Sequence, residues 1–353
     1  MKKKTQRTQK FTENTEKICA NLCNLWFLSL ASSVPLAPLV LLSWRPVSNG
    51  KHIPQYLHLT AHRPTINDFP PLPMPNVGIL TDASAHLLNK NFPGAERVHI
   101  HPLTLLWEGG EHLLPNQALS AKLPPTLLGE TPPRLILPSR RELRARLHEL
   151  ALRYDSLLIL PMESTLSPLF QRLLEIADET PESFPVYVMD THTFGVGLGW
   201  LVRQAALLAS MGKGLFDLLS ALRPMRERIY TMLCIESLTY LHHTGLLDPA
   251  QAIVGEMLGL CPLFVLEDGR LVPMHKARSG RHMLDLLEDF AGEFGDLAEI
   301  AIVYGARRFA REARHLQSRL RNLYPHAAIH MAELDAVTAA TLGPRTIGVF
   351  VME

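Results

Sequence analysis

The sequence has little of what marks secreted, zinc-binding or nucleic-acid-binding proteins. Its 353 residues include only four cysteines, Cys19, Cys23, Cys234 and Cys261. These are too few and too scattered for a disulfide framework or for a zinc site with paired ligand spacing. We expect Cys234 and Cys261 to be buried thiols in a reducing compartment. The formal net charge is only +1, so no excess of positive charge favours binding to nucleic acid.

Common catalytic motifs are absent as well. The sequence contains neither a G-x-S-x-G nucleophile elbow nor a phosphate-binding P-loop, so nucleophilic hydrolysis is unsupported. Gly195, Gly197 and Gly199 follow an expected strand, but their spacing differs from the dinucleotide fingerprint G-x-G-x-x-G. We expect these glycines to serve close helix packing instead.

Histidines offer only weak candidates for a metal site. His99 and His101 stand two apart on an expected strand and therefore face one way. No Asp, Glu or His stands near them in a recognisable ligand arrangement. We predict a packed or surface histidine pair there, a loop at His242-His243, and no metal site.

What the sequence does contain is the composition of a globular protein with a sizeable core. It is 47% hydrophobic and 20% charged, and 353 residues are enough for two domains. Residues 45–75 hold seven prolines, which predicts an extended linker. We expect a leader and linker over residues 1–75, an N-terminal α/β domain over 76–205 and a C-terminal α/β domain over 206–353.

The leader leaves several hypotheses open. Residues 1–17 are basic, and residues 18–44 carry no charge over 27 positions, enough to cross the ~30 Å hydrocarbon core of a bilayer. This favours a membrane anchor or a secretory signal, although Asn21, Asn24 and two prolines oppose a spanning helix. The alternatives are a disordered tail and translation that begins at Met74. We therefore expect a cytoplasmic protein, or a membrane-anchored one if residues 18–44 act as an anchor.

Short apolar runs alternate with helical periodicity from Val77 onward, which indicates an α/β fold. The expected strands are 77–81, 98–106, 157–161, 185–189, 230–235, 263–266, 271–274, 299–304, 327–331 and 346–352. One helix is expected to begin after Ser139, whose side chain forms a capping box with Glu142. The other expected helices are 167–179, 196–210, 214–226, 249–258, 281–294 and 307–323. Asp268-Gly269 predicts a hairpin between two of the strands. We therefore expect a mainly parallel sheet in the first domain and a mixed sheet that includes this hairpin in the second.

Small hydroxyl side chains gather where three of the expected strands end. They are Thr81 and Ser84, then Ser164, Thr165 and Ser167, and then Thr191 and Thr193. Converging hydroxyls without a base are suited to hydrogen-bonding an oxyanion such as a carboxylate. The alternative interpretation is that each one caps the helix that follows it.

A series of short motifs occurs in a fixed order from Val77 to Val351, a span of 275 residues. The motifs are GILTDAS at 78–84, PLT at 102–104, ESTLS at 163–167, VMDT at 188–191, LTYL at 238–241, LFVLEDG at 263–269 and GP at 343–344. In their order and spacing the chain resembles the DegV family of bacterial fatty-acid-binding proteins.

The resemblance implies both a fold and a function. It implies two α/β domains with a long-chain fatty acid held in a tunnel, its carboxylate bonded by hydroxyls and a histidine. Such proteins are not enzymes and need no cofactor. In bacteria that have the partner, they present the acid to the catalytic subunit of a fatty-acid kinase. Burial of an acyl chain at ~0.8 kcal/mol for each CH₂ supplies the affinity.

The chain departs from the family pattern at the head-group site. Leu135 and Ile136 stand where the family has carboxylate-binding hydroxyls, and Thr341 stands at the position of the histidine. Arg134 or Arg345 is a candidate replacement cation. The expected ligand-binding residues are therefore Ser164, Thr341, Thr165, Arg134 and Arg345, and the residues expected to organise the pocket are Thr81, Asp82 and Ser84.

These departures keep a second function open. The chain is expected to bind a fatty acid, and the alternative is a degenerate scaffold or regulatory interaction protein that has kept the fold without the ligand. An enzyme acting on a small oxyanion lacks a candidate base.

Overall fold

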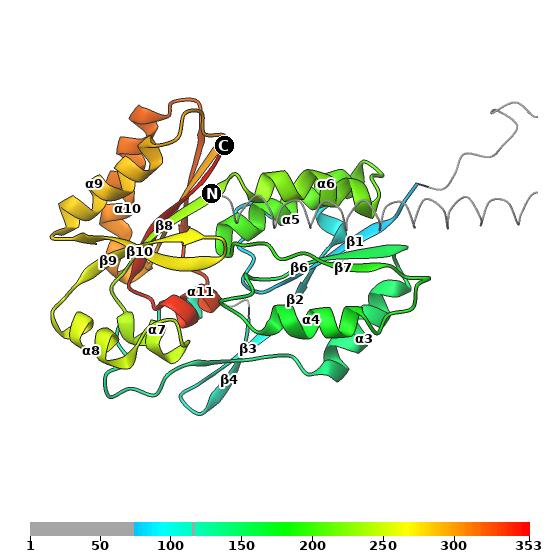
Figure 1. Cartoon of the computed structure of the whole chain (residues 1–353), viewed down its shortest axis with the longest axis horizontal. Coiled ribbons are helices and arrows are strands. Elements are labelled where there is room, and N and C mark those ends of the chain that lie inside the picture. Colours follow the sequence, from blue (N-terminus) through cyan, green and yellow to red (C-terminus); the bar gives the residue numbers. More distant parts are fainter. Residues whose placement is uncertain (1–73, 115–116) are drawn as a thin grey trace, which may run out of the picture. The chain divides into compact units, whose positions relative to one another are not determined.

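The computed structural model describes residues 74–353 except 115–116, and they belong to one compact unit, Leu72–Glu353 (Figure 1). The leader predicted over residues 1–73 lies outside the described residues. Among the helices of the described part, none is both long and apolar enough to cross a membrane.

The first sheet is entirely parallel, as expected for the N-terminal half. Its strands run in the order β2-β1-β6-β7. They are β1 (Val77–Asp82), β2 (Val98–His101), β6 (Ser156–Leu160) and β7 (Val186–Val188). Helices α5 (Gly195–Ser210) and α6 (Leu215–Arg226) cover one face, and α3 (Arg140–Ala151) and α4 (Leu169–Ala177) cover the other (Figure 1). Because both faces are covered, all six residues of β1 are buried.

The predicted start of α3 is confirmed. The hydroxyl Oγ of Ser139 accepts from the backbone N–H of Glu142 at 3.2 Å, and the Glu142 carboxylate accepts from the backbone N–H of Ser139 at 2.6 Å. The helix then buries Leu143, Leu147 and Leu150 on one face.

The second sheet has six strands and is mixed, as predicted. Its order is β10-β9-β8-β13-β11-β12, and only β11 and β12 pair in parallel. The strands are β8 (Ile229–Ile235), β9 (Cys261–Glu267), β10 (Arg270–Ala277), β11 (Glu299–Tyr304), β12 (Ala328–Glu333) and β13 (Thr346–Met352). Asp268 and Gly269 have φ angles of 48° and 77° between β9 and β10, the positive values that a tight hairpin turn requires.

A small third sheet and three short helices were not predicted. Pro102 divides the strand expected over 98–106, so that β2 ends at His101 and β3 begins at Leu103. The third sheet has the order β4-β3-β5 and consists of β3 (Leu103–Trp107), β4 (Gly110–Leu114) and β5 (Arg134–Ile136). The further helices are α2 (Gln117–Ser120), α7 (Leu238–His243) and α11 (Ala336–Leu342). The loop predicted at His242-His243 was wrong, because both residues form the last turn of α7.

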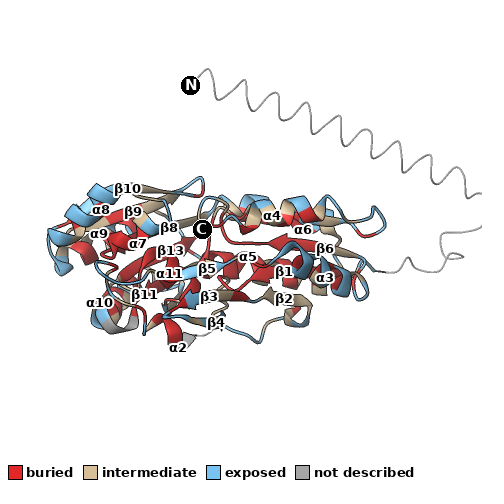
Figure 2. Cartoon of the chain, turned by 90° about the horizontal axis from the view of Figure 1, so that it is seen from below, coloured by how far each residue is buried: buried red, intermediate tan, exposed pale blue. Residues whose placement is uncertain are grey.

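The central strand β13 of the mixed sheet is buried on both faces. On β13, Ile347, Val349 and Val351 pack with α9 (Gly280–Gly292) and α10 (Ala306–Leu323), while Phe350 and Met352 belong to the core of the first sheet. The rings of Phe350 and Phe194 meet edge to face, with centroids 5.5 Å apart. Buried residues therefore run through both sheets (Figure 2). The boundary between residues 205 and 206 stays a prediction.

The closely spaced glycines of α5 confirm the prediction of close helix packing. A Cβ atom on Gly199 would lie 2.3 Å from the backbone oxygen of His86. The backbone N–H of His86 in turn donates to the oxygen of Gly195 at 2.9 Å. The segment after β1 therefore lies directly on the first turns of α5.

Gly199→Ala should lower the free energy of unfolding by about 1–2 kcal/mol, because a methyl group would collide with a backbone atom that cannot rotate away. Urea unfolding followed by circular dichroism measures the change. Gln204→Ala, on the same helix at a half-buried position, is the matched control and should change the stability by less than about 0.5 kcal/mol. Equal stability of Gly199→Ala and the unmodified chain would contradict the packing argument.

Candidate functional site

The polar residues at the end of β1 are bonded to neighbouring strands. The Thr81 hydroxyl donates to the backbone oxygen of Leu160 at 2.7 Å. The Asp82 carboxylate accepts from the backbone N–H groups of Ser84 and Met162, each at 2.8 Å. Asp82 thus fixes the end of β1 to the loop after β6. The role predicted for Thr81, Asp82 and Ser84 in organising a pocket stays a prediction.

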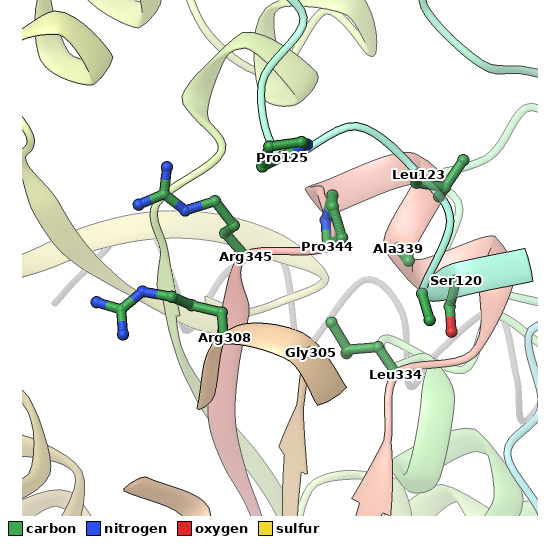
Figure 3. Close-up of a pocket in the computed structure, with 10 residues that line it drawn as sticks. Ser120, Leu123, Pro125, Gly305, Arg308, Leu334, Ala339, Pro344 and Arg345 are labelled. Carbon is green, nitrogen blue, oxygen red and sulfur yellow. The ribbon is translucent and has the colours of Figure 1, made fainter. Parts of the chain in front are cut away.

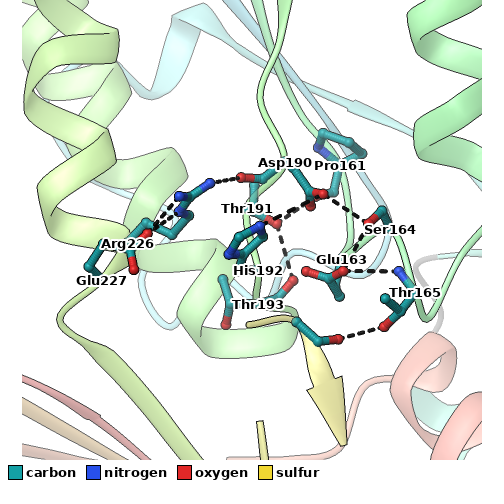
Figure 4. A network of polar contacts seen from close by, with 11 residues as sticks. Pro161, Glu163, Ser164, Thr165, Asp190, Thr191, His192, Thr193, Arg226 and Glu227 are labelled. Atoms are coloured by element: carbon teal, nitrogen blue, oxygen red, sulfur yellow. Dashed lines mark hydrogen bonds and ion pairs between the residues drawn. The ribbon is translucent and has the colours of Figure 1, made fainter. Parts of the chain in front are cut away.

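Ser164 lies in a compact polar group that we call the Glu163 cluster, made of Glu163, Ser164, Asp190 and His192 (Figure 4). The Ser164 Oγ is 2.9 Å from Glu163 Oε1 and 2.8 Å from Asp190 Oδ2. A hydroxyl has one proton to donate, so it satisfies one carboxylate at a time. The imidazole Nε2 of His192 lies 3.9 Å from Asp190 Oδ2.

Burial governs the chemistry of Glu163. The residue is 1% exposed, and desolvation raises its pKa to about 7, assisted by the charge of Asp190. Its Oε1 accepts from the backbone N–H of Thr165 at 2.9 Å. Among the described residues, neither Glu163 Oε2 nor Asp190 Oδ1 has a hydrogen-bond partner, although both atoms are buried.

The hairpin of the mixed sheet closes over this cluster. The Thr165 hydroxyl donates to the backbone oxygen of Gly269 at 2.5 Å. A Cβ atom on Gly269 would lie 2.3 Å from the carboxyl carbon of Glu163. The turn between β9 and β10 therefore helps to exclude water from the Glu163 carboxylate.

An apolar cavity of about 300 Å³, which we call the arginine cavity, lies where α11, β13 and the segment after α2 meet (Figure 3). Its lining consists of Ser120, Ala121, Leu123, Pro125, Gly305, Arg308, Leu334, Ala339, Pro344 and Arg345. Figure 3 shows the guanidinium groups of Arg308 and Arg345 at one end of the lining and Leu334 and Ala339 at the other. One end thus carries two guanidinium groups, and the rest of the lining is largely apolar.

Glu236 holds both arginines. Its carboxylate is 2.7 Å from the guanidinium of Arg345 and 3.2 Å from that of Arg308, and the Glu236 side chain is only 7% exposed. It also accepts from the thiol of Cys261 at 3.4 Å. Cys234 and Cys261 are both free. Cys234 is buried, as predicted, whereas Cys261 is only half-buried, so its predicted burial was wrong. Arg308 is also 3.8 Å from the carboxylate of Glu312, so two guanidinium groups and two carboxylates meet at this end of the cavity.

The other predicted head-group residues lie elsewhere. The Thr341 hydroxyl is buried and donates within its own helix to the backbone oxygen of Val337 at 2.9 Å. Arg134 is exposed at the start of β5. In the described part of the chain, no hydrogen bond joins any two of Ser164, Thr341, Arg134 and Arg345.

Several residues at these sites were missed by sequence reasoning. Glu236 and Arg308 belong to no motif, and their partner Arg345 was identified only as a candidate cation. Glu236 follows β8 directly, so its position after a strand end was the available signal. His192 lies between the hydroxyl residues Thr191 and Thr193. No spacing typical of metal ligands in the sequence identified it as a candidate.

His99 is a packed histidine, as predicted. Its Nε2 is 2.8 Å from the hydroxyl of Tyr154, and the two rings meet edge to face at 5.4 Å. Burial, together with the charges of Arg146 and Arg153, lowers the pKa of His99 to about 4.

A second hollow, which we call the His86 groove, has a volume of about 620 Å³. Its lining is largely apolar, with His86, Lys90 and Asp335 as the titratable residues. The lining also includes Ala83, Ala85, Leu87, Phe92, Ala95, Val98, Ile100 and Leu113.

Comparison with known proteins gives a consistent result. The DegV family model, described as "Uncharacterised protein, DegV family", matches residues 76–353. A DegV domain-containing protein of Streptomyces coelicolor is 30% identical over 198 residues, which cover 56% of this chain and 70% of that protein. A DegV domain-containing protein of Streptococcus pyogenes is 26% identical over 280 residues, covering 78% of this chain and 97% of that protein.

Solved structures share the fold. A fatty acid binding DegV family protein from Streptococcus agalactiae is similar with a TM-score of 0.68 and 22% identity, covering 78% of this chain and 98% of that one. The Streptococcus pneumoniae fatty acid kinase (Fak) B3 protein, loaded with linoleic acid, is similar with a TM-score of 0.66 and 15% identity, covering 78% and 99%.

Proposed function

The chain belongs to the DegV family, and on that basis we propose that it binds a long-chain fatty acid without transforming it. The observation that carries the proposal is the arginine cavity, because an apolar hollow with guanidinium donors at one end suits an acyl chain with a carboxylate. Structures of similar fold are described as fatty-acid-binding, which supports the same ligand class. No cofactor is part of the proposal.

The full-length chain, purified and extracted with organic solvent, should release about one long-chain fatty acid for each chain, as measured by mass spectrometry. Added fatty acid should raise the thermal midpoint of delipidated protein, because a ligand that binds only the folded state stabilises it by about 2.7 kcal/mol at 100 times its Kd. A protein that yields no acyl lipid and gains no thermal stability would overturn the proposal.

We place the carboxylate against Arg345. Arg345→Met keeps the length of the side chain and removes its charge, and it should weaken binding of a fluorescent fatty acid about 10- to 30-fold. Arg314→Met, at an exposed position of α10, is the matched control and should bind like the unmodified chain. Unchanged affinity in Arg345→Met would exclude this position for the head group.

Ser164, Thr165, Thr341 and Arg134 are the alternative head-group residues. If Ser164 is the donor to the carboxylate, Ser164→Ala should weaken binding by about 1–3 kcal/mol. Measuring Ser164→Ala beside Arg345→Met therefore assigns the head group to the Glu163 cluster or to the arginine cavity.

A scaffold or regulatory protein without lipid is the second candidate. The observation that favours it is the environment of Ser164, whose hydroxyl faces the carboxyl groups of Glu163 and Asp190. Two acidic neighbours oppose the approach of a third carboxylate. The extraction experiment separates the two functions directly.

We further propose a cytoplasmic protein that presents its fatty acid to a kinase. The similarity of fold to the pneumococcal fatty acid kinase (Fak) B3 protein supports this partner. Incubation of the loaded chain with a bacterial fatty-acid kinase and ATP would test it by the formation of acyl phosphate. Anchoring through residues 18–44 remains the alternative location.

A further inference from the structure

We propose that Glu163, Asp190 and His192 bind one divalent transition-metal ion. The three residues offer two carboxylate oxygens and one imidazole nitrogen, a ligand set that suits Mn²⁺ or Zn²⁺. The site goes beyond the proposed fatty-acid function, because none of the three residues lines the arginine cavity.

The spacing of the ligand atoms fits a common ion. One atom from each residue lies within 4.8 Å of the other two, and His192 Nε2 is 3.9 Å from Asp190 Oδ2. Neighbouring ligands of a tetrahedral ion are about 3.4 Å apart, since each metal–ligand bond is about 2.1 Å long. The His192–Asp190 pair would therefore close by about half an ångström on binding, and the widest pair by up to about 1.4 Å.

Unpartnered buried oxygens point to a ligand that the described residues do not supply. Glu163 is 1% exposed, and its Oε2 has no hydrogen-bond partner within the described part of the chain. Asp190 Oδ1 is a second buried oxygen of this kind. A buried carboxylate oxygen without a donor is costly, and a cation bound beside Glu163 Oε2 would satisfy that atom. Figure 4 shows the Glu163 carboxylate and the His192 ring on the same side of Asp190.

The surrounding contacts would orient the ligands. The Ser164 hydroxyl lies within hydrogen-bond distance of both carboxylates and donates to one of them, and the Thr165 backbone N–H donates to Glu163 Oε1. Neighbouring groups fix metal ligands in proteins in this way. One charge opposes the ion, namely the guanidinium of Arg226, which donates to the backbone oxygen of Asp190 at 2.8 Å. Glu227 partly neutralises it, because its carboxylate is 2.6 Å from the same guanidinium.

The ion would join the two sheets. Glu163 and Asp190 follow strands of the parallel sheet, and the turn of the β9–β10 hairpin packs on Glu163. Fixing the Glu163 carboxylate would therefore stabilise the contact between this turn and the strand ends.

The test is Mn²⁺ binding by the full-length chain, after chelator treatment and dialysis at pH 8. Mn²⁺ is the first probe because it prefers oxygen and nitrogen ligands to thiolates. Electron paramagnetic resonance of the unbound ion should show one equivalent bound, and the thermal midpoint should rise with Mn²⁺. Zn²⁺, followed by calorimetry, should bind at the same stoichiometry.

Two variants test whether Glu163 and His192 are ligands of the bound ion. Glu163→Gln and His192→Asn should each weaken Mn²⁺ binding at least tenfold, and asparagine tolerates the φ of 51° at position 192. Glu175→Gln, an exposed acid of α4, is the control and should bind like the unmodified chain. A circular dichroism spectrum and metal-free thermal midpoint like those of the unmodified chain verify that each variant folds.

The proposal is overturned if the unmodified chain binds no equivalent of Mn²⁺. It is also overturned if one equivalent survives at the same affinity in either Glu163→Gln or His192→Asn, because the ion would then lie elsewhere. A proton shared by Glu163 and Asp190 in place of a metal gives the first of these results.

Discussion

Ala121→Trp should reduce fatty-acid affinity by more than 100-fold, about 2.7 kcal/mol. Ala121 is half-buried and lines the arginine cavity, whose volume is about 300 Å³, and an indole ring at this position would occupy part of that space. A ligand that must share this space would lose the apolar burial that supplies its affinity. Titration with a fluorescent fatty acid, together with mass spectrometry of the extracted lipid, measures the loss.

Two further tryptophan variants test whether the loss of affinity comes from filling the arginine cavity. Lys122→Trp adds the same ring at the adjacent exposed position and should bind normally. Ala85→Trp fills part of the His86 groove instead and should also bind normally. If Ala85→Trp abolishes binding and Ala121→Trp does not, the acyl chain lies in the His86 groove and the assignment to the arginine cavity is wrong.

Acidification should destabilise the protein through His99. Its pKa is about 4 in the folded protein, below the ordinary value of 6.5 that the unfolded chain recovers. Between these values the unfolded state binds more protons than the folded state, so stability falls as the pH drops from 6.5 toward 4. Burial is the main cause, and Arg146 and Arg153 add to it while Glu149 acts in the opposite direction. Allowing for solvent screening, we expect a loss of about 2–3 kcal/mol from this group.

The measurement is the free energy of unfolding in urea at pH 7 and at pH 4. His99→Gln is the comparison variant, because glutamine can place an amide near the Tyr154 hydroxyl, 2.8 Å from His99 Nε2, and does not titrate. The unmodified chain should lose about 2–3 kcal/mol more than this variant on acidification. Equal losses would show that His99 accepts a proton without cost in the folded protein.

Local sequence patterns predicted strands, a helix start and a hairpin, because interactions between residues close in the chain determine these features. The all-buried strand at Val77–Asp82 is a continuous apolar run up to Thr81 and Asp82, and Ser139 with Glu142 caps a helix through contacts three residues apart. Asp268-Gly269 specifies a hairpin through backbone angles alone. Two short strands of the third sheet, β4 and β5, escaped prediction, because three to five residues at a partly exposed sheet carry little periodicity.

The candidate sites required the tertiary structure. The hydrogen bond between Arg345 and Glu236 joins residues 109 positions apart, and the one between Thr165 and Gly269 joins residues 104 positions apart. No local spacing in the sequence predicts either contact. The resemblance to the DegV family predicted Ser164 as a donor, but only the fold places Glu163 and Asp190 beside its hydroxyl. By itself the sequence determined the family, the strand order along the chain and the hydroxyls at strand ends. The tertiary structure decided which charges surround those hydroxyls and where the arginine cavity lies. Electrostatics and burial depend on distances in space, and only the fold brings residues that are far apart in the chain close together.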